Sequence, residues 1–378
     1  MAPFLILLVF FLEVSTSQGI KLPLWSLRKF NTTEVNSIHF NEDVGGYVTV
    51  ITFGSLTNMH SQLMNFDSGS DICWVPIRSY KRRQQALSCQ TQICKNIFHG
   101  DCDSANRCKF DVAYDRGNAR GIIIEDSVIL PGARSGQDFV PQNHFYFGFA
   151  QSQQGLTAGV GVLGMNRGSS SFISQFRDAL GGNVFSFCMP IETSLSTIAN
   201  DDEQEFGTLT LGDDARRVNG LATVPLRERE EDKGMFFVTI VGLTIDGDYI
   251  AIAPQLLLID TGSTFTSLTP TIYTLVIQKF QNLLPGRKKV ISQAMCFRAC
   301  DCGPVEDIPK LAYHFDNGVH MELVPHNLFD RQGDFWCSTI RKGETNILGL
   351  AHLMNILVLL DSDNSLFGFK RNCMGYAK

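Results

Sequence analysis

Two short segments of the chain have nearly the same sequence, and each carries an aspartate. The sequence is FDSGS at residues 66–70 and IDTGS at residues 259–263, in each case at the end of an apolar run. Asp67 and Asp260 both precede a hydroxyl residue and a glycine. About one domain length separates them. A duplicated domain that presents one carboxylate from each half at a central cleft explains this repeat.

Two carboxyl groups brought together at a cleft can perform acid and base catalysis. They cannot both ionise, so they share one proton, and one acts as general acid while the other acts as general base. A water molecule between them can then attack an amide. A lone Asp-Ser/Thr-Gly sequence is usually a turn or a cap. The hypothesis therefore depends on its recurrence after two matched apolar strands.

At these residues the chain resembles the pepsin-like aspartic proteases, and more narrowly their plant nepenthesin-like branch, over residues 44–376. The segment GYVTVITFG at 46–54 is similar to the family's opening strand, and SDICWV at 70–75 is similar to the stretch after the first aspartate. The resemblance implies an all-β fold, mainly β with few short helices, in which two related β-lobes flank a central active-site cleft. It also implies that no cofactor and no metal take part.

Two further apolar segments occupy the same relative place in each half of the chain. They are GVLGM at residues 161–165 and NILGL at residues 346–350. In the family such segments support the catalytic loops from behind. Their apolar residues are expected in the core, and their glycines allow close approach of the backbone.

The segment YDRGNARG at residues 114–121 lies where the family carries its flap, a hairpin whose tyrosine closes over the substrate. Tyr114 is therefore the expected flap residue. The glycines suit a hairpin tip that requires positive φ, and closure would exclude water from the cleft. The family usually has small residues after the tyrosine, whereas this chain has Asp115 and Arg116. Without the flanking motifs, the same segment would be an ordinary surface hairpin.

Hydroxyl residues beside the two aspartates are expected to hold the carboxylates in place, because buried carboxylates need hydrogen bonds and a rigid setting. Ser68 and Thr261 are the expected scaffold, and Ser68 stands where the family usually has threonine. Two serines can each bond the aspartate of their own segment, although a turn-forming serine is an equally ordinary interpretation. With two glycines, the expected supporting residues are Ser68, Gly69, Ser70, Thr261, Gly262 and Ser263.

Two more residues are expected near the substrate. Trp74 is expected behind the flap, where its indole N–H reaches Tyr114. Simple filling of the core is the alternative role for Trp74. The resemblance assigns Thr264, which follows the second aspartate segment, to substrate binding.

The chain contains eleven cysteines, which indicates disulfides formed outside the cytosol. Four of them, where the nepenthesin-like branch has a cysteine-rich insert, are Cys89, Cys94, Cys102 and Cys108. Zinc binding is the competing interpretation, but the spacing lacks a Cys-x2-Cys pair. The connectivity of these four residues is left open.

The resemblance implies two further disulfides, which join Cys296 to Cys337 and Cys188 to Cys373. Cys73, Cys300 and Cys302 have no assigned partner, and the odd total leaves at least one thiol free or bonded to another molecule. Cys73 lies near Asp67 in the sequence but has no base partner that would make it a nucleophile.

The N-terminal residues 4–12, FLILLVFFL, are too short to cross a bilayer and are followed by small residues through Ser17. Residues 1–17 are thus predicted to be a secretory signal peptide. Residues 18–43 are expected to be a short N-terminal or pro segment, and Asn31 within it is a glycosylation acceptor. The C terminus carries no apolar tail of the kind that would indicate a lipid anchor. We expect a secreted (extracellular, apoplast) or vacuolar protein without a membrane anchor.

The length of 378 residues fits a bilobed unit. The net charge of −6 argues against nucleic acid as a binding partner. We expect residues 44–200 to form the N-terminal lobe with the flap, and residues 201–378 to form the C-terminal lobe. Short runs of Val, Ile, Phe and Thr predict strands throughout. Helical patterns are confined to residues 172–180 and 270–284, and the polar residues 191–206 are expected to link the lobes.

Two functions are compatible with these residues. The first is an aspartic endopeptidase that hydrolyses peptide bonds of protein or peptide substrates at acidic pH, as a monomer. The alternative is a catalytically impaired pepsin-fold protein that binds and inhibits a glycosidase such as xylanase. Retention of both aspartates and of their hydroxyl neighbours favours the enzyme, because burying a carboxylate pair costs several kcal/mol. The altered flap and short pro segment favour the binder.

Overall fold

The computed structural model describes residues 20–27, 46–55, 57–78, 80, 85–131, 139–191, 206–291, 293–302 and 307–374. The expected signal peptide, the glycosylation acceptor Asn31 and the expected lobe boundary near residue 200 lie outside the described residues.

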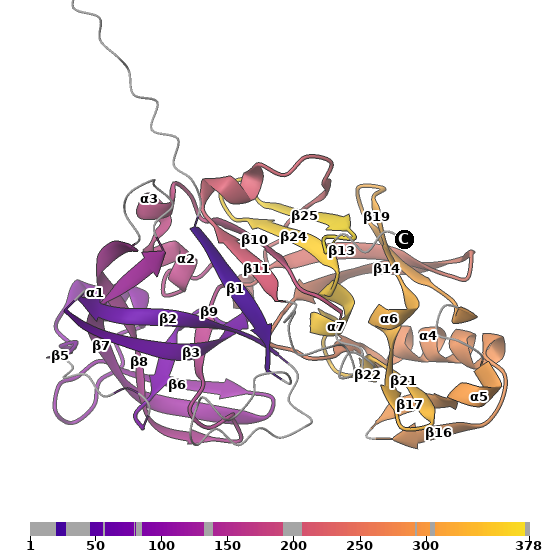
Figure 1. The fold of residues 1–378 in the computed structure, drawn as a ribbon, viewed down its shortest axis with the longest axis horizontal. Helices are drawn as coiled ribbons and strands as arrows, with labels where there is room; N and C mark the ends of the chain where they lie inside the picture. Colours follow the sequence, from indigo (N-terminus) through magenta and orange to yellow (C-terminus); the bar gives the residue numbers. More distant parts are fainter. Residues whose placement is uncertain are drawn as a thin grey trace, which may run out of the picture.

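Two β-rich lobes lie side by side, with further strands between them (Figure 1). The first lobe contains β2 (Tyr47–Ser55), β3 (Asn58–Asp67), β4 (Trp74–Pro76), β5 (Gln85–Ala86), β6 (Lys109–Tyr114), β7 (Gly117–Pro131), β8 (Phe139–Gln154) and β9 (Gly161–Gly164), with helices α1 (Gln92–Ile97), α2 (Phe172–Gln175) and α3 (Arg177–Leu180). In the second lobe, a seven-stranded sheet is formed by β13 (Phe237–Ile245), β14 (Asp248–Ile259), β15 (Thr266–Leu268), β18 (Leu311–Phe315), β19 (His320–Leu323), β22 (Ile340–Lys342) and β23 (Ile347–Leu348).

A smaller four-stranded sheet completes the second lobe and is formed by β16 (Lys288–Ile291), β17 (Ala294–Arg298), β20 (Phe329–Gln332) and β21 (Phe335–Ser338). The helices of this lobe are α4 (Pro270–Leu283), α5 (Ala299–Cys302), α6 (Pro325–Leu328) and α7 (Leu350–Leu353). The expected mainly β, bilobed architecture with few short helices is confirmed.

Strands from the beginning, middle and end of the chain meet between the lobes. They are β12 (Ala222–Pro225), β25 (Leu366–Arg371), β24 (Ile356–Asp361), β10 (Val184–Cys188), β11 (Gly207–Leu211) and β1 (Ile20–Ser26), in that order, and they continue into the sheet of the first lobe. All five residues of β10 are buried. Because β10 pairs antiparallel with both β11 and β24, it joins the two halves of the chain through backbone hydrogen bonds.

Strand β1 lies within the segment expected to precede the folded body. It pairs antiparallel with β11, where Ile20 lies opposite Leu211, and its end pairs with β2. Ile20, Leu22 and Leu24 are buried, so alternate side chains of β1 enter the core. At least this part of residues 18–43 therefore belongs to the sheet.

The two helical predictions have different outcomes. The pattern at 270–284 forms α4, which begins at Pro270, a position where the missing N–H costs nothing. The pattern at 172–180 forms two short helices, α2 and α3, separated at Phe176. Gly181 then ends α3 in the left-handed conformation, with φ of 74°.

Aromatic packing anchors the strand that carries the first aspartate. Phe66, the residue before Asp67, is fully buried and contacts Phe187 of β10 with ring centroids 5.1 Å apart. Its ring also lies 6.1 Å from that of Phe185. Edge-to-face contacts of this kind stabilise a core by about 0.5–1.5 kcal/mol beyond area burial. The end of β3 is thereby held against the sheet that joins the lobes.

The structure pairs eight of the cysteines in four disulfides, which join Cys89 to Cys102, Cys94 to Cys108, Cys188 to Cys373 and Cys296 to Cys337. Cys73 is free and buried, and burial raises the pKa of its thiol to about 12, so it remains protonated. Within the described part of the chain, no helix is long and apolar enough to cross a membrane.

Candidate active site

Each aspartate stands at the end of a long strand whose backbone is held by a shorter parallel strand. Asp67 ends β3, and β9 runs parallel beside it with Gly164 opposite Asp67. Asp260 directly follows β14, which is paired in parallel with β23, and its N–H donates to the Leu348 carbonyl at 3.1 Å. These supporting strands are the apolar segments that the sequence placed behind the two loops.

The loops after the two strands have the same hydrogen-bond pattern. In each, one carboxylate oxygen accepts from the glycine N–H two residues on, at 2.9 Å, and the other accepts from the serine hydroxyl three residues on, at 2.6 Å. The donors are Gly69 and Ser70 for Asp67, and Gly262 and Ser263 for Asp260. Each loop therefore orients its own carboxylate through two donors.

The two carboxylates face each other across the loops. A Cβ built on Gly69 would lie 2.5 Å from Oδ1 of Asp260, and one built on Gly262 would lie 2.5 Å from Oδ1 of Asp67. Real side chains do not tolerate such contacts, so each glycine makes room for the carboxylate of the opposite loop. The two glycines explain why a carboxylate from each half can enter one site.

Ser68 and Thr261 lock the two loops together through four reciprocal hydrogen bonds. The Ser68 N–H donates to Oγ1 of Thr261 at 2.9 Å, and the Thr261 N–H donates to Oγ of Ser68 at 3.0 Å. The Ser68 hydroxyl donates to the Ile259 carbonyl at 3.1 Å, and the Thr261 hydroxyl donates to the Phe66 carbonyl at 3.0 Å. Both side chains are buried. Ser68, which stands where the family usually has threonine, thus makes two hydrogen bonds through its hydroxyl, to the Ile259 carbonyl and from the Thr261 N–H.

Burial and mutual repulsion change the titration of the pair. Burial, followed by the charge of Asp260, raises the pKa of Asp67, while the bonds from Ser70 and Gly69 partly oppose the increase. Burial also raises the pKa of Asp260, against the bonds from Ser263 and Gly262. The pair therefore retains one proton at pH values at which an isolated aspartate has lost it.

Tyr114 lies at the end of the hairpin formed by β6 and β7, opposite Gly117, with Asp115 and Arg116 as the turn residues. The indole N–H of the buried Trp74 donates to the Tyr114 hydroxyl at 2.8 Å. Burial, followed by the charge of Asp67, raises the pKa of the Tyr114 phenol. The tyrosine ring end is thus close to the Asp67 loop, and Trp74 contacts it from behind.

The flap glycines serve a different purpose from the one expected. Neither Gly117 nor Gly121 has positive φ. Instead, a Cβ on Gly117 would lie 2.0 Å from the Gln154 carbonyl oxygen, and one on Gly121 would lie 2.0 Å from the Phe149 carbonyl oxygen. Both contacts are with β8, so glycine is needed here because a neighbouring backbone passes close by.

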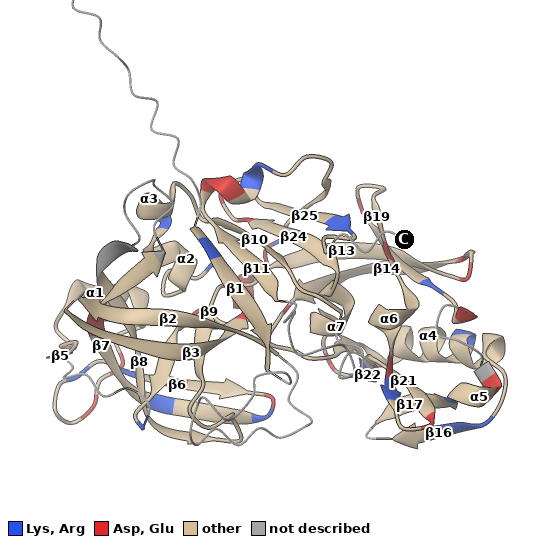
Figure 2. Cartoon of the chain, viewed as in Figure 1, with Lys and Arg blue, Asp and Glu red and all other residues tan. Residues whose placement is uncertain are grey.

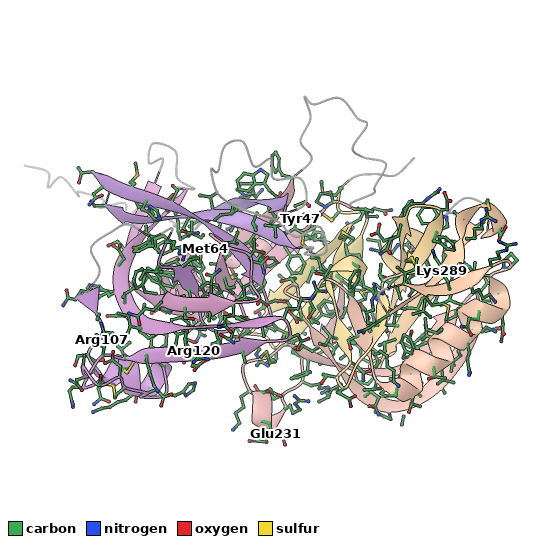
Figure 3. The ribbon with its side chains drawn as sticks, turned by 90° about the horizontal axis from the view of Figure 1, so that it is seen from below. Tyr47, Met64, Arg107, Arg120, Glu231 and Lys289 are labelled. Carbon is green, nitrogen blue, oxygen red and sulfur yellow. A yellow bond between two sulfur atoms is a disulfide. The ribbon has the colours of Figure 1, made fainter. Side chains whose placement is uncertain are left out.

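The flap hairpin is also supported along its length. Arg120 of β7 lies opposite Asp111 of β6, and their side chains form an exposed ion pair at 3.8 Å. Behind β6, the disulfide-bonded residues Cys94 and Cys108 pack with Trp74 in one buried cluster. Figure 3 labels Arg120 in the first lobe and Lys289 in the second lobe.

Thr264 continues the Asp260 loop, and its carbonyl accepts from the Ala351 N–H at 3.1 Å. Nearby, Gly349 allows its backbone to pass close to that of Phe265, because a Cβ built on Gly349 would lie 2.2 Å from the Phe265 carbonyl oxygen. The backbone of Thr264 is thus held by the segment that begins α7, and the expected role of Thr264 in substrate binding stays a prediction.

Two residues close to the second loop were not predicted from the sequence. Arg341 of β22 lies over the ring of Phe265, with its Cζ 3.9 Å from the ring centroid. His352, in α7, is fully buried between Tyr313 and Thr339, 3.2 Å from each hydroxyl. Burial lowers the pKa of His352 to about 3, so it is neutral and supports the loop from within the core. No local sequence pattern marks any of these contacts.

Comparison with known proteins places these features in a family. The family model described as xylanase inhibitor N-terminal matches residues 47–213, and the one described as xylanase inhibitor C-terminal matches residues 235–371. An aspartyl protease family protein of Arabidopsis thaliana is 26% identical over 316 residues, which cover 75% of this chain and 62% of that protein. The chain thus spans less than two thirds of that relative's length.

Two other comparisons cover more of the molecule. Aspartic proteinase nepenthesin-2 of Nepenthes gracilis is 25% identical over 362 residues, which cover 86% of this chain and 77% of that protein. The crystal structure of basic 7S globulin from soybean has a TM-score of 0.76 at 18% identity, covering 96% of this chain and 97% of that one. Conglutin gamma, a basic 7S globulin from lupine seeds, has a TM-score of 0.77 with the same identity and coverage. The resemblance seen in the sequence is confirmed: the chain belongs to the pepsin-like aspartic protease family, in the group described by the xylanase inhibitor N-terminal and C-terminal models.

Proposed function

We propose that this protein is an aspartic endopeptidase that hydrolyses peptide bonds at acidic pH. The observation that carries the proposal is the pair of equivalent carboxylates, each held by a glycine N–H and a serine hydroxyl and each facing the glycine of the opposite loop. Two buried carboxylates in this arrangement share a proton. The relatives named as aspartic proteases support the same activity.

In the proposed mechanism, Asp67 and Asp260 act as one unit. The ionised carboxylate removes a proton from a water molecule, which attacks the scissile carbonyl carbon, while the protonated carboxyl donates its proton to the carbonyl oxygen. The tetrahedral intermediate then collapses: the carboxyl that took up the water proton gives it to the nitrogen as the C–N bond breaks, and a hydroxyl of the intermediate returns its proton to the other carboxylate, which restores the shared proton. Because each carboxylate is held by two donors, little reorganisation is needed when the charge moves.

Tyr114 is proposed to close over an extended peptide from the flap side. Its hydroxyl is held by Trp74, which fixes the ring direction before the substrate arrives. Thr264 is proposed to contact the substrate from the opposite loop, since its own backbone is anchored to Ala351. A peptide bound as an extended strand would run between these two elements.

The test is hydrolysis of a denatured globular protein by the purified chain between pH 2 and 7, with and without a transition-state-mimicking inhibitor such as pepstatin. We expect activity in acid that the inhibitor abolishes. Asp67→Asn and Asp260→Asn should each lower the rate by at least a thousandfold, because the shared proton and the base are lost together. Asp178→Asn, which changes an exposed aspartate of α3, is the matched control and should retain full activity.

If either active-site Asn variant hydrolysed the substrate at the wild-type rate, the mechanism would be refuted. Absence of hydrolysis by the folded wild-type chain, at every pH and with several protein substrates, would refute the enzyme proposal.

We further propose that the protein acts as a monomer outside the cytosol, in the extracellular space or in a vacuole. The four disulfides support an oxidising compartment. The N-terminal apolar segment supports entry into the secretory pathway. Its protein or peptide substrates would then be encountered in the same compartment.

A second candidate function is inhibition of a glycosidase such as xylanase by the same fold. The matched family models are described as xylanase inhibitor domains, and the flap turn carries Asp115 and Arg116, which depart from the small residues usual there. Stable binding of a xylanase, with loss of xylanase activity and no peptide hydrolysis at any pH, would favour this function over the first.

A further inference from the structure

His352 of α7 lies at the centre of a buried chain of polar side chains in the second lobe. Its Nδ1 lies 3.2 Å from the Tyr313 hydroxyl, and its Nε2 lies 3.2 Å from the Thr339 hydroxyl. The Thr339 hydroxyl donates to the Asn327 carbonyl at 2.7 Å, and the Asn327 amide donates to two carbonyls of the α7 segment at 2.9 Å each. All four side chains are buried. The ring therefore connects α7 to β18 and to the segment before β22.

The hydrogen bonds assign the protonation state of the His352 ring. Because Thr339 donates its one hydroxyl proton to Asn327, its oxygen can only accept from His352, so Nε2 carries a hydrogen. Nδ1 then accepts from the Tyr313 hydroxyl. In a protonated ring both nitrogens are donors, and the Tyr313 hydroxyl proton would lose its acceptor. The network is complete only while the ring is neutral.

Among the described residues, no charged side chain bonds the ring. Neither α6 nor α7 carries a Lys, Arg, Asp or Glu, and both ribbons are tan in Figure 2. Tyr313 bonds the ring, and burial raises the pKa of its phenol. Burial alone, with no contribution from a neighbouring charge, lowers the pKa of His352 to about 3. The other titratable groups on the loop and on the elements around α7 are Asp260, His314 of β18, His326 of α6, Arg341 and Lys342 of β22, and Asp361 of β24.

Helix α7 is bonded directly to the second aspartate loop. Two backbone N–H groups at its start donate to the carbonyls of Ser263 and Thr264, at 2.8 and 3.1 Å. The Ser263 hydroxyl in turn donates to the Asp260 carboxylate. A displacement of His352 would therefore move the backbone groups that hold the loop, and with them a donor of the carboxylate.

We propose that His352 is a positioning residue for the second aspartate loop and acts only as a neutral ring, so that its protonation inactivates the enzyme in strong acid. This inference rests on the proposed function for the activity that it predicts. Protonation would break the bond from Tyr313 and leave an unpaired charge in the core, which is costly. Helix α7 would then shift, and the Asp260 loop would shift with it. The acid limit of activity would be set by this buried scaffold as well as by the carboxylate pair.

The test is the pH dependence of kcat/KM between pH 1.5 and 6, with folding checked by near-ultraviolet circular dichroism. We expect wild-type activity to fall below about pH 3. His352→Gln offers one donor and one acceptor and does not titrate, so its acid limit should lie at least about 0.5 pH unit lower. Tyr313→Phe removes the donor that favours the neutral ring, so its acid limit should lie higher. His320→Gln, which changes an exposed histidine of β19, is the matched control and should follow the wild type.

Opposite shifts in the two variants distinguish this role from simple packing, because a loss of packing lowers activity without moving the acid limit in two directions. If either variant kept the wild-type limit, the inference would be overturned and the endopeptidase would stand. If a variant does not fold, the wild-type ring is observed by NMR of isotope-labelled histidine. At pH 5 we expect neutral His352 with its hydrogen on Nε2, whereas the other tautomer or a charged ring would overturn the inference.

A chain that hydrolyses no peptide still allows the test. Hydrogen exchange of residues 258–266 is compared at pH 5 and pH 2.5, after correction for the pH dependence of intrinsic exchange, with residues 65–73 as the internal reference. Faster corrected exchange of the second aspartate loop alone at pH 2.5, absent in His352→Gln, would support the inference. Unchanged exchange, or the same increase in His352→Gln, would overturn it.

Discussion

Removal of the Ser68 hydroxyl tests the reciprocal lock between the two aspartate loops. Ser68→Ala deletes two hydrogen bonds and leaves the Thr261 N–H and the Ile259 carbonyl without that hydroxyl, in a site where Ser68 is fully buried. Two bonds of about 1 kcal/mol each, with a further cost for buried groups left unpaired, predict a loss of about 2–4 kcal/mol in the free energy of unfolding. Activity should fall as well, because the carboxylates lose their common support.

The measurement is urea unfolding followed by near-ultraviolet circular dichroism, with kcat/KM for one peptide as the second readout. Ser68→Thr is the informative control, since it keeps the hydroxyl and adds the methyl that the family usually has; it should retain most of the stability. Ser152→Ala, on an exposed position of β8, should change the free energy by less than about 0.5 kcal/mol. If Ser68→Ala changed stability as little as Ser152→Ala, the lock would contribute nothing and the reasoning would be refuted.

Two further predictions concern the pH dependence of the site and the flap. Because burial and the charge of Asp260 raise the pKa of Asp67 above its ordinary value of 3.8, the folded protein holds a proton that the unfolded chain releases. The stabilisation that comes from this bound proton is therefore complete below pH 3.8 and is lost as the pH rises through the raised pKa of Asp67. The free energy of unfolding should thus fall more steeply between pH 4 and 7 for the wild type than for Asp67→Asn. Equal slopes would contradict this prediction. Trp74→Phe removes the hydrogen bond to the Tyr114 hydroxyl and should lower kcat/KM by about three- to tenfold. It should also lower stability, because Trp74 is fully buried and the smaller ring leaves a cavity. Unchanged kinetics would show that the flap does not depend on this bond.

Local sequence was sufficient to predict the parts of the site that lie close together along the chain. The glycine and serine that orient each carboxylate are within three residues of it, so the repeated segment predicted both as supporting residues, and the serine hydroxyl bond was one of the two interpretations of each serine. The hydrogen bond from Trp74 to Tyr114 was one of two interpretations of Trp74, and it depended on the resemblance, which implied that both residues lie at the flap. Whether these residues catalyse the reaction remains a prediction.

Other features depended on backbone positions that no local pattern encodes. The sequence assigned the flap glycines to positive φ, whereas the structure shows that Gly117 and Gly121 are required by the close passage of β8. The pairing of the insert cysteines was open among alternatives until the fold placed Cys89 beside Cys102 and Cys94 beside Cys108. Cysteine spacing along a chain does not determine which sulfur atoms meet.

The sequence by itself determined the family, the mainly β bilobed fold and the two loops that carry aspartates, because repeated motifs and apolar strands are local properties of the chain. Only the tertiary structure decided that β1 joins the sheet between the lobes and that Arg341 lies over Phe265. Both result from the way distant segments pack against each other. Their positions follow from long-range packing, which no local sequence pattern encodes.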